Sequence, residues 1–151
     1  MITGNALAFR TGEERDFEAL VALRTRAMRA SLERIGRFDP DRVRDRLRST
    51  FEPMHMRVAV SGDAIIGCVT VRPGGPKAAW IEHFYLEPSH QGRGLGATMM
   101  SDIARWADHD GVVLRLSVLK ESDANRFYVR YGFVETHREA WDIYYERQPA
   151  R

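Results

Sequence analysis

A glycine-rich turn between a strand pattern and a helix pattern constrains this chain more than any other feature. The turn reads Gln91-Gly92-Arg93-Gly94-Leu95-Gly96. Residues 79–86 before it are apolar and rich in aromatic side chains, and residues 95–110 after it repeat apolar side chains with the helical period. Such a turn exposes backbone N–H groups at a helix N-terminus, where the helix dipole favours a phosphate. Because glycine has no Cβ, a pyrophosphate can approach the backbone closely. The pattern therefore predicts a phosphate-cradling site for a nucleotide-like cofactor.

The spacing of the glycines separates three kinds of phosphate loop. A Walker A loop ends in Gly-Lys-Ser/Thr, whereas Gly96 is followed by Ala97-Thr98. A dinucleotide loop has G-x-G-x-x-G spacing, and here the third glycine comes one position early. The remaining pattern, Gln-x-x-Gly-x-Gly, is matched by Gln91, Gly94 and Gly96. A strand-to-helix turn with a capping glycine is the alternative that involves no ligand.

A second motif follows a β-branched apolar run at residues 112–119, which predicts a buried strand. The segment 122–133 then shows helical spacing, and Gly132 supplies a left-handed stop. The residues at this spacing are Ala124, Phe127, Tyr128 and Tyr131.

The two motifs together resemble those of the GNAT superfamily of N-acetyltransferases. The first resembles the superfamily's acetyl-CoA loop, and the second resembles its pattern of Asn, Ala, Phe-Tyr and Gly-Phe. The family's leading Asn falls at Glu121, so this position departs from the pattern, and Asn125 lies one helical turn further on. The resemblance covers residues 58–145. The residues that match the second motif in order and spacing are Ala124, Phe127, Tyr128, Gly132 and Phe133.

The order of the predicted elements is β-α-α-β-β-β-α-β-α-β-β, beginning with an edge strand at residues 6–10. This order predicts an α+β fold with a mixed, mostly antiparallel central sheet of about seven strands flanked by four helices. The length suits one domain over residues 1–151, and the resemblance implies that it is an N-acetyltransferase domain. The resemblance implies the same order and a splay between the fourth and fifth strands, where acetyl-CoA would lie. Splayed strands leave backbone groups that the amides of pantetheine can satisfy.

The resemblance also implies a set of cofactor contacts. The backbone of residues 84–86 would pair with pantetheine, and an N–H at Leu86 or the next peptide would polarise the thioester carbonyl. The cofactor-binding residues expected in this way are Phe84, Tyr85, Leu86, Gln91, Gly92, Arg93, Gly94, Leu95, Gly96, Ala97 and Asn125.

Transfer of an acetyl group to an amine needs a base, because an alkyl amine with a pKa of about 10.4 is mostly protonated at neutral pH. Glu82 is the candidate base, since its position in the strand shares the parity of Trp80, Phe84 and Leu86. The superfamily often uses a Glu on this strand, and some members place it two residues earlier. A rim glutamate paired with an arginine is the other interpretation. His83 is the rival by residue type, although strand alternation directs it to the opposite face.

The thiolate that leaves in the reaction is expelled more easily when an acid protonates it. By resemblance, Tyr128 is the tyrosine that faces the cofactor sulfur, and it is the candidate general acid. Phe127 and Tyr131 are interpreted as core residues.

The remaining composition narrows the class of protein. The single cysteine, Cys68, excludes an internal disulfide and favours a reducing cytoplasm. Because Cys68 lies within a strand pattern, we interpret it as a small core residue rather than a nucleophile. The five histidines are scattered, so no metal site is predicted. No signal peptide and no membrane span are visible.

The leading hypothesis is a cytoplasmic, acetyl-CoA-dependent N-acetyltransferase that transfers the acetyl group directly in a ternary complex. The acceptor stays open between a small amine, an amino acid, an antibiotic, a protein N-terminus and a lysine. The aromatic side chains that could wall its site are those of Trp80, His83, Tyr85 and Trp141, with Glu87 or Asp142 for a cationic group.

Two other functions are compatible with the sequence. One is an acyl-CoA-binding sensor without transferase activity, which the departure at Glu121 would fit. The other is an RNA-directed acetyltransferase toxin, because nine arginines and only four acidic residues lie between Arg24 and Arg48. These arginines also suit the solvated faces of two helices, and the net charge of +2 is too small to argue for nucleic acid. Since many family members pair through their C-terminal strands, residues 143–145 are a candidate homodimer contact.

Overall fold

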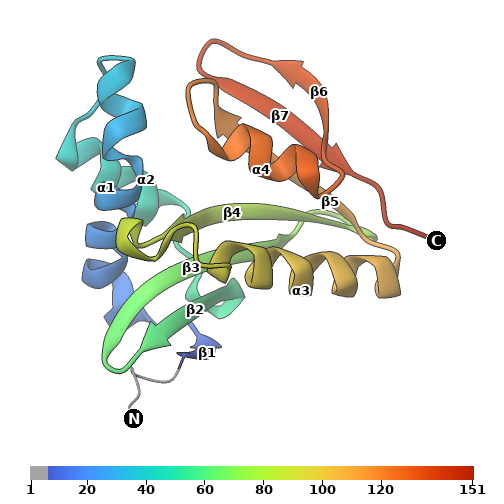
Figure 1. Ribbon diagram of the computed structural model, residues 1–151, viewed down its shortest axis with the longest axis horizontal. Coiled ribbons are helices and arrows are strands. Elements are labelled where there is room, and N and C mark those ends of the chain that lie inside the picture. Colours follow the sequence, from blue (N-terminus) through green and yellow to red (C-terminus); the bar gives the residue numbers. More distant parts are fainter. Residues whose placement is uncertain (1–6) are drawn as a thin grey trace. The chain divides into compact units, whose positions relative to one another are not determined.

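The computed structural model describes residues 7–151, so Ala6, where the first strand is expected to begin, lies outside the described residues. Within this range the elements follow the predicted order (Figure 1). The seven strands are β1 Leu7–Thr11, β2 Met56–Ser61, β3 Ala64–Pro73, β4 Ala78–Leu86, β5 Val113–Leu119, β6 Val134–Arg138 and β7 Asp142–Arg147. The four α-helices are α1 Phe17–Arg34, α2 Pro40–Ser49, α3 Leu95–Asp110 and α4 Ala124–Arg130. No helix in the described range is both long and apolar enough to span a membrane.

The strands form one sheet in the order β1-β2-β3-β4-β5-β7-β6. Four of its pairs are antiparallel, namely β1–β2, β2–β3, β5–β7 and β6–β7. The pair β4–β5 is parallel, and its register runs only from Ala78–Val113 to Trp80–Arg115, at the start of both strands. This short ladder is the splay expected between the fourth and fifth strands. The predicted α+β fold, with a mixed sheet and four flanking helices, is confirmed.

The chain divides into two compact units. Unit 1 comprises residues 7–70 and 83–95, and unit 2 comprises residues 71–82 and 96–151. Strands β3 and β4 therefore each contribute residues to both units. The single domain expected over residues 1–151 stays a prediction.

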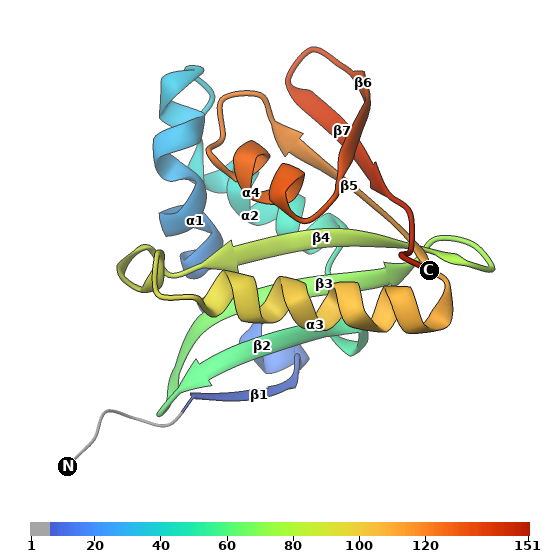
Figure 2. The same cartoon turned by 45° about the vertical axis from the view of Figure 1, so that its right-hand side comes forward.

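Unit 1 is built around helices α1 and α2, which lie side by side in both views (Figures 1 and 2). The apolar stripe of α1 packs on β2 and β3, and α2 begins where Asp39 accepts hydrogen bonds from the N–H groups of Asp41 and Arg42. At the start of α1, the Arg10 guanidinium forks onto Asp16 at 2.8 Å, and these hydrogen bonds lower the pKa of the Asp16 carboxyl. The core of the unit consists of Phe17, Leu20, Leu23, Leu47, Met56, Val58 and Cys68.

Unit 2 contains the antiparallel strands β5, β7 and β6, together with α4 and all of α3 after Leu95. Arg147 of β7 is a central tie in this unit. Its guanidinium donates to both oxygens of Asp108 in α3, at 2.8 and 3.2 Å, and to the carbonyl of Tyr131 at 2.8 Å. Only 12% of the Arg147 side chain is exposed, so these charge-assisted bonds are partly shielded from water. They hold β7, α3 and the turn after α4 together.

Candidate active site

The glycine-rich turn has the backbone that its sequence predicts. Gly92 and Gly94 have φ values of +79° and +84°, in the left-handed region that favours glycine. A Cβ built at either position would meet no other atom within 4 Å. The protein therefore does not fill the space beside these glycines, and their backbone is exposed immediately before the first turn of the 16-residue helix α3. A pyrophosphate fits this arrangement, because N–H groups at a helix N-terminus attract anions.

Contacts on both sides of the glycine-rich turn fix its ends. A short 3-10 turn, Pro88–His90, leads into the loop, and the Gln91 side chain reaches back to the carbonyl of Leu86 at 3.5 Å. Arg93 is exposed, whereas Leu95 is buried. Further on, the carbonyl of Ala97 accepts a 3.4 Å hydrogen bond from the Tyr131 hydroxyl.

Strand β4 changes its backbone conformation at His83. This residue has a φ of +50°, which is uncommon for a side chain other than glycine and costs about 1–3 kcal/mol. The alternation that relates Glu82 to Phe84 and Leu86 is therefore interrupted, and parity cannot be carried across this position. No pattern within residues 79–86 indicates this break.

The His83 ring joins a polar network inside unit 1. Arg24, which is only 7% exposed, donates from Nε to the Tyr85 hydroxyl at 2.8 Å and from Nη1 to the carbonyl of Val43 at 2.8 Å. The Tyr85 hydroxyl lies 3.4 Å from His83 Nδ1, and His83 Nε2 lies 2.6 Å from Thr50 Oγ1. The Thr50 hydroxyl also donates to the carbonyl of Arg46 at 3.3 Å.

Glu82 lies in unit 2 and forms an ion pair with Arg72 of β3. Arg72 donates from Nη2 to Oε1 at 2.7 Å and from Nε to Oε2 at 3.4 Å. The Glu82 side chain is 23% exposed, so water still reaches it. The pairing with an arginine, which the sequence offered as the other interpretation of Glu82, is thus present, and it also fixes the direction of the carboxylate.

Tyr128 is buried on α4 at 7% exposure. Its ring makes edge contacts with Phe127 and Phe133, at centroid distances of 5.3 and 5.6 Å. Phe127 is also close to Tyr131, which supports the interpretation of these neighbours as packing residues. An isosteric replacement of Tyr128 can therefore keep the packing while removing the hydroxyl.

The side chain of Asn125 forms its hydrogen bonds with other residues of the protein. Its Nδ2 donates to the carbonyls of Leu119 and Ser122, at 2.9 and 2.8 Å, and its Oδ1 accepts from the Tyr145 hydroxyl at 2.8 Å. These bonds tie the connection between β5 and α4 to β7. Any effect of Asn125 on the cofactor would act through the shape of this connection.

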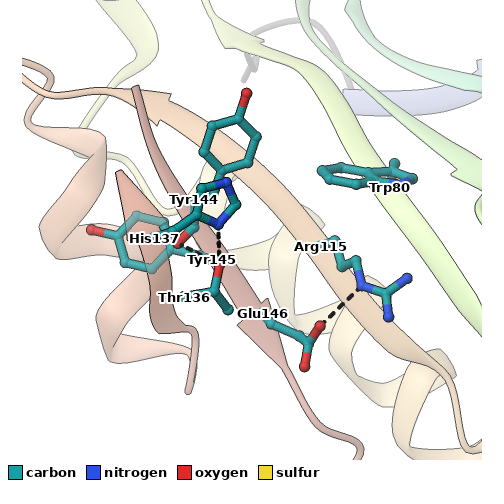
Figure 3. A pocket seen from close by; sticks show the side chains of 7 residues that line it. All are labelled: Trp80, Arg115, Thr136, His137, Tyr144, Tyr145 and Glu146. Atoms are coloured by element: carbon teal, nitrogen blue, oxygen red, sulfur yellow. Dashed lines mark hydrogen bonds and ion pairs between the residues drawn. The ribbon is translucent and has the colours of Figure 1, made fainter. Parts of the chain in front are cut away.

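A pocket of about 230 Å³ opens in unit 2 (Figure 3). It combines aromatic rings with the ion pair between Arg115 and Glu146, whose Nε and Oε2 atoms are 3.0 Å apart. Of the aromatic residues expected to wall an acceptor site, Trp80 lines this pocket, but His83, Tyr85 and Trp141 do not. The lining residues are Trp80, Arg115, Thr136, His137, Tyr144, Tyr145 and Glu146. Sequence reasoning missed most of them, because β5–β7 register decides which side chains meet.

About half of the nine arginines in the stretch between Arg24 and Arg48 form ion pairs or are buried. Four of its members form ion pairs with acidic side chains, and Arg24 is buried in the network described above. The four pairs are Arg26–Glu87, Arg29–Glu33, Arg44–Glu18 and Arg48–Glu14. This pairing favours the interpretation as solvated helix faces. It also takes Glu87 away from any cationic ligand.

Two other kinds of reactive site would be a metal site and a nucleophilic cysteine. No group of three or more His, Cys, Asp or Glu side chains within residues 7–151 could hold a metal ion. Cys68 is 1% exposed, its thiol donates to the carbonyl of His83 at 3.1 Å, and burial raises its pKa to about 12.

Several solved structures with this fold are acetyltransferases or N-acetylglutamate synthases. The chain is similar to PaiA N-acetyltransferase from Thermoplasma acidophilum in complex with coenzyme A, with 16% identity, a TM-score of 0.77, and coverage of 95% of this chain and 99% of that one. It is also similar to the ribosomal-protein-S18-alanine N-acetyltransferase from Escherichia coli, with 15% identity, a TM-score of 0.72, and coverage of 97% and 96%. N-acetylglutamate synthase from Neisseria gonorrhoeae, complexed with coenzyme A and N-acetyl-glutamate, matches at 14% identity and a TM-score of 0.68, with coverage of 99% and 36%. At these identities the likeness shows the fold, which is GNAT-like.

A family model then assigns the chain. The model of the Acetyltransferase (GNAT) family matches residues 17–133, and the protein belongs to this family. The matched range contains both the glycine-rich loop and the helix that carries Tyr128. A comparison with curated proteins found no match.

The burial of Cys68 makes a prediction about its reactivity. The thiolate is the reactive form of cysteine, and a pKa of about 12 leaves very little of it at pH 8. We therefore expect the native protein to react with Ellman's reagent at least about 100-fold more slowly than the same protein unfolded in urea. Rapid native labelling would contradict the buried position and reopen a covalent acetyl-cysteine intermediate.

Proposed function

We propose that the protein is an N-acetyltransferase that moves an acetyl group from acetyl-CoA to a primary amine by direct transfer in a ternary complex. The observation that carries the proposal is the exposed left-handed backbone at Gly92 and Gly94, at the start of α3 in a member of the GNAT family. The proposal locates the protein in the cytoplasm, since its one cysteine forms no disulfide. Pairing of two copies through residues 143–145 stays a prediction.

The loop residues would hold the cofactor by its phosphates. Backbone N–H groups within residues 92–97 bind the pyrophosphate, and the exposed Arg93 adds a positive charge beside it. The bound cofactor supplies an activated acetyl thioester. The backbone of Phe84, Tyr85 and Leu86 pairs with the pantetheine amides, and an N–H at Leu86 or the next peptide donates to the carbonyl oxygen on which negative charge develops.

Glu82 acts as the general base in this proposal. It takes the proton that the acceptor ammonium must lose, and it does so through water because Arg72 already occupies Oε1. The freed amine lone pair then attacks the thioester carbon. The C–N bond forms and the C–S bond breaks. The second proton of the amine passes to solvent water, and Glu82 returns its own proton to solvent before the next turnover.

Tyr128 acts as the general acid. Its hydroxyl donates a proton to the sulfur as the C–S bond breaks, so that the thiol rather than the thiolate leaves. Its burial on α4 supports this role, because a shielded donor stabilises developing charge more strongly than one in water. The phenol then recovers its proton from solvent. No covalent acyl-protein intermediate is needed, in keeping with the buried Cys68.

The loop assignment predicts the outcome of one substitution. In Gly94→Glu, a side chain and a negative charge both enter the space proposed for the pyrophosphate, so we expect acetyl-CoA binding to be lost in calorimetry. Gly111→Glu is the matched control, because Gly111 also has a positive φ, of +68°, and open space around it, but ends α3 instead of preceding it. Unchanged affinity in Gly94→Glu, or equal loss in both variants, would remove the loop from the proposal.

The acid assignment predicts a selective loss of turnover. In Tyr128→Phe, we expect kcat in a CoA-release assay to fall on the order of 10- to 10⁴-fold while the Kd for acetyl-CoA changes little. Tyr131→Phe, which removes a hydroxyl bonded only weakly to Ala97, should retain most of its turnover. If both variants turn over like the wild type, Tyr128 belongs with the packing residues.

The base assignment is tested in the same assay. Glu82→Gln keeps the shape of the side chain but cannot accept a proton, so we expect kcat/KM at neutral pH to fall on the order of 10²- to 10⁴-fold. Glu18→Gln is the control, since it also removes a carboxylate paired with an arginine, that of Arg44, on the surface of unit 1. Wild-type kcat/KM in Glu82→Gln would exclude this residue and leave His83 as the next candidate.

A further inference from the structure

The pocket in unit 2 is built on one row of side chains across the sheet. Trp80 of β4 is in register with Arg115 of β5, and Arg115 is in register with Glu146 of β7. Residues in register on neighbouring strands point to the same face, so the three side chains form a continuous row. Figure 3 shows Trp80 and the Arg115–Glu146 pair on the pocket wall.

In this row, Arg115 has N–H groups that make no hydrogen bond within the described part of the chain, whereas both oxygens of the Glu146 carboxylate accept one. Glu146 accepts from Arg115 Nε through Oε2 at 3.0 Å, and from Gln148 Nε2 through Oε1 at 2.8 Å. The two Nη atoms of Arg115 make no hydrogen bond with residues 7–151, and Figure 3 shows them directed away from Glu146. A guanidinium edge with free N–H groups matches a carboxylate in a bidentate geometry. The Arg115–Glu146 pair is formally neutral, and it is the Nη edge of Arg115 that offers hydrogen-bond donors to an anionic group.

The other walls are aromatic. His137 and Tyr144 stack with a centroid distance of 4.3 Å and an angle of 11° between their planes. Burial and the nearby charges of Glu139 and Asp142 raise the pKa of the Tyr144 phenol, so this ring stays neutral. The Trp80 indole forms the opposite side. Flat rings of this kind bind a planar group by stacking and by burial of its apolar surface.

The proposed base lies close to this pocket in the chain. Glu82 follows Trp80 by two residues, before the break at His83, so the two side chains share a face of β4 with their Cα atoms about 7 Å apart. A ligand whose ring and carboxylate occupy the pocket can therefore direct a nearby amine toward the Glu82 carboxylate. The volume of about 230 Å³ suits a single small molecule rather than a folded partner.

We propose that the pocket of Trp80, Arg115, His137 and Tyr144 binds the acetyl acceptor, and that the acceptor is a primary amine carrying both a planar ring and a carboxylate, as an aromatic amino acid does. This inference rests on the proposed function. The carboxylate binds the Nη edge of Arg115, and the ring packs between Trp80 and the His137–Tyr144 stack.

The first experiment compares acceptors that differ by one group. CoA release is measured with L-phenylalanine, with L-phenylalaninamide and phenethylamine, which lack the carboxylate, and with L-alanine, which lacks the ring. We expect kcat/KM for L-phenylalanine to exceed each of the others by at least about 10-fold, as a charge-assisted hydrogen bond or a buried ring contributes. Equal use of all four amines would overturn the inference and leave the proposed function intact.

Two substitutions should change the acceptor preference in opposite directions. Arg115→Gln should raise KM for L-phenylalanine on the order of 10- to 100-fold and leave KM for phenethylamine unchanged. Glu146→Gln should lower KM for L-phenylalanine by about two- to five-fold, because it removes a negative charge beside the bound carboxylate. Arg105→Gln, which alters an exposed arginine paired with Asp102 on α3, should change neither value. A general loss of folding would affect both amines alike, so a parallel rise in both KM values in Arg115→Gln would overturn the inference.

A binding measurement separates this inference from the proposed function. 3-Phenylpropionate has the ring and the carboxylate but no amine, so it cannot be acetylated. We expect calorimetry to detect its binding to the wild-type protein and a loss of binding in Arg115→Gln. If no amine is acetylated but this Arg115-dependent binding is present, the proposed function fails while the ligand class of the pocket stands. If 3-phenylpropionate does not bind, or binds equally to Arg115→Gln, the pocket assignment is wrong whatever the activity.

Discussion

The left-handed backbone of His83 is the local constraint on which the arrangement of strand β4 depends. Glu82 is the last residue of β4 that belongs to unit 2, and His83 is the first that belongs to unit 1. A φ of +50° costs about 1–3 kcal/mol, and hydrogen bonds worth about 1 kcal/mol each offset it. These bonds are the one from the Cys68 thiol to the His83 carbonyl, and those of the His83 ring with Thr50 and Tyr85. The strain is thus maintained by contacts within unit 1, and the two halves of β4 belong to different units.

The two halves of β4 therefore carry different kinds of functional groups. The first half, with Trp80 and Glu82, carries an aromatic wall and a carboxylate that Arg72 holds in place. The second half, residues 83–86, carries side chains that join the network around the buried Arg24, and the backbone proposed to pair with pantetheine. The parallel ladder with β5 covers only Ala78 to Trp80, so backbone groups further along β4 are not used by that ladder.

Local patterns predicted the parts of the molecule that depend on near neighbours in sequence. The glycine loop and the start of α3 at Leu95 both depend on a few consecutive residues, and the structure has them at the predicted positions. The alternation argument for Glu82 does not extend past His83. The left-handed conformation there is accompanied by contacts with Thr50, which follows α2, and with Cys68 of β3, and no spacing within β4 reveals these contacts. Asn125 could be located on its helix, but its bond to Tyr145 depends on tertiary packing.

The residues of the pocket likewise could not be predicted from local sequence patterns. The sequence was enough to predict that Trp80 lines an acceptor site. The pocket also contains Arg115, Glu146 and His137, and only the register of β5, β7 and β6 brings these side chains together. A shift of one residue in the β5–β7 register would send the Arg115 side chain to the opposite face from Glu146. The free Nη donors would then have no aromatic enclosure, and selectivity for a ring with a carboxylate would have no physical basis. Members of one family can therefore share the loop for the common cofactor and differ in acceptor, because the loop is fixed by local glycines whereas the acceptor pocket is fixed by strand register.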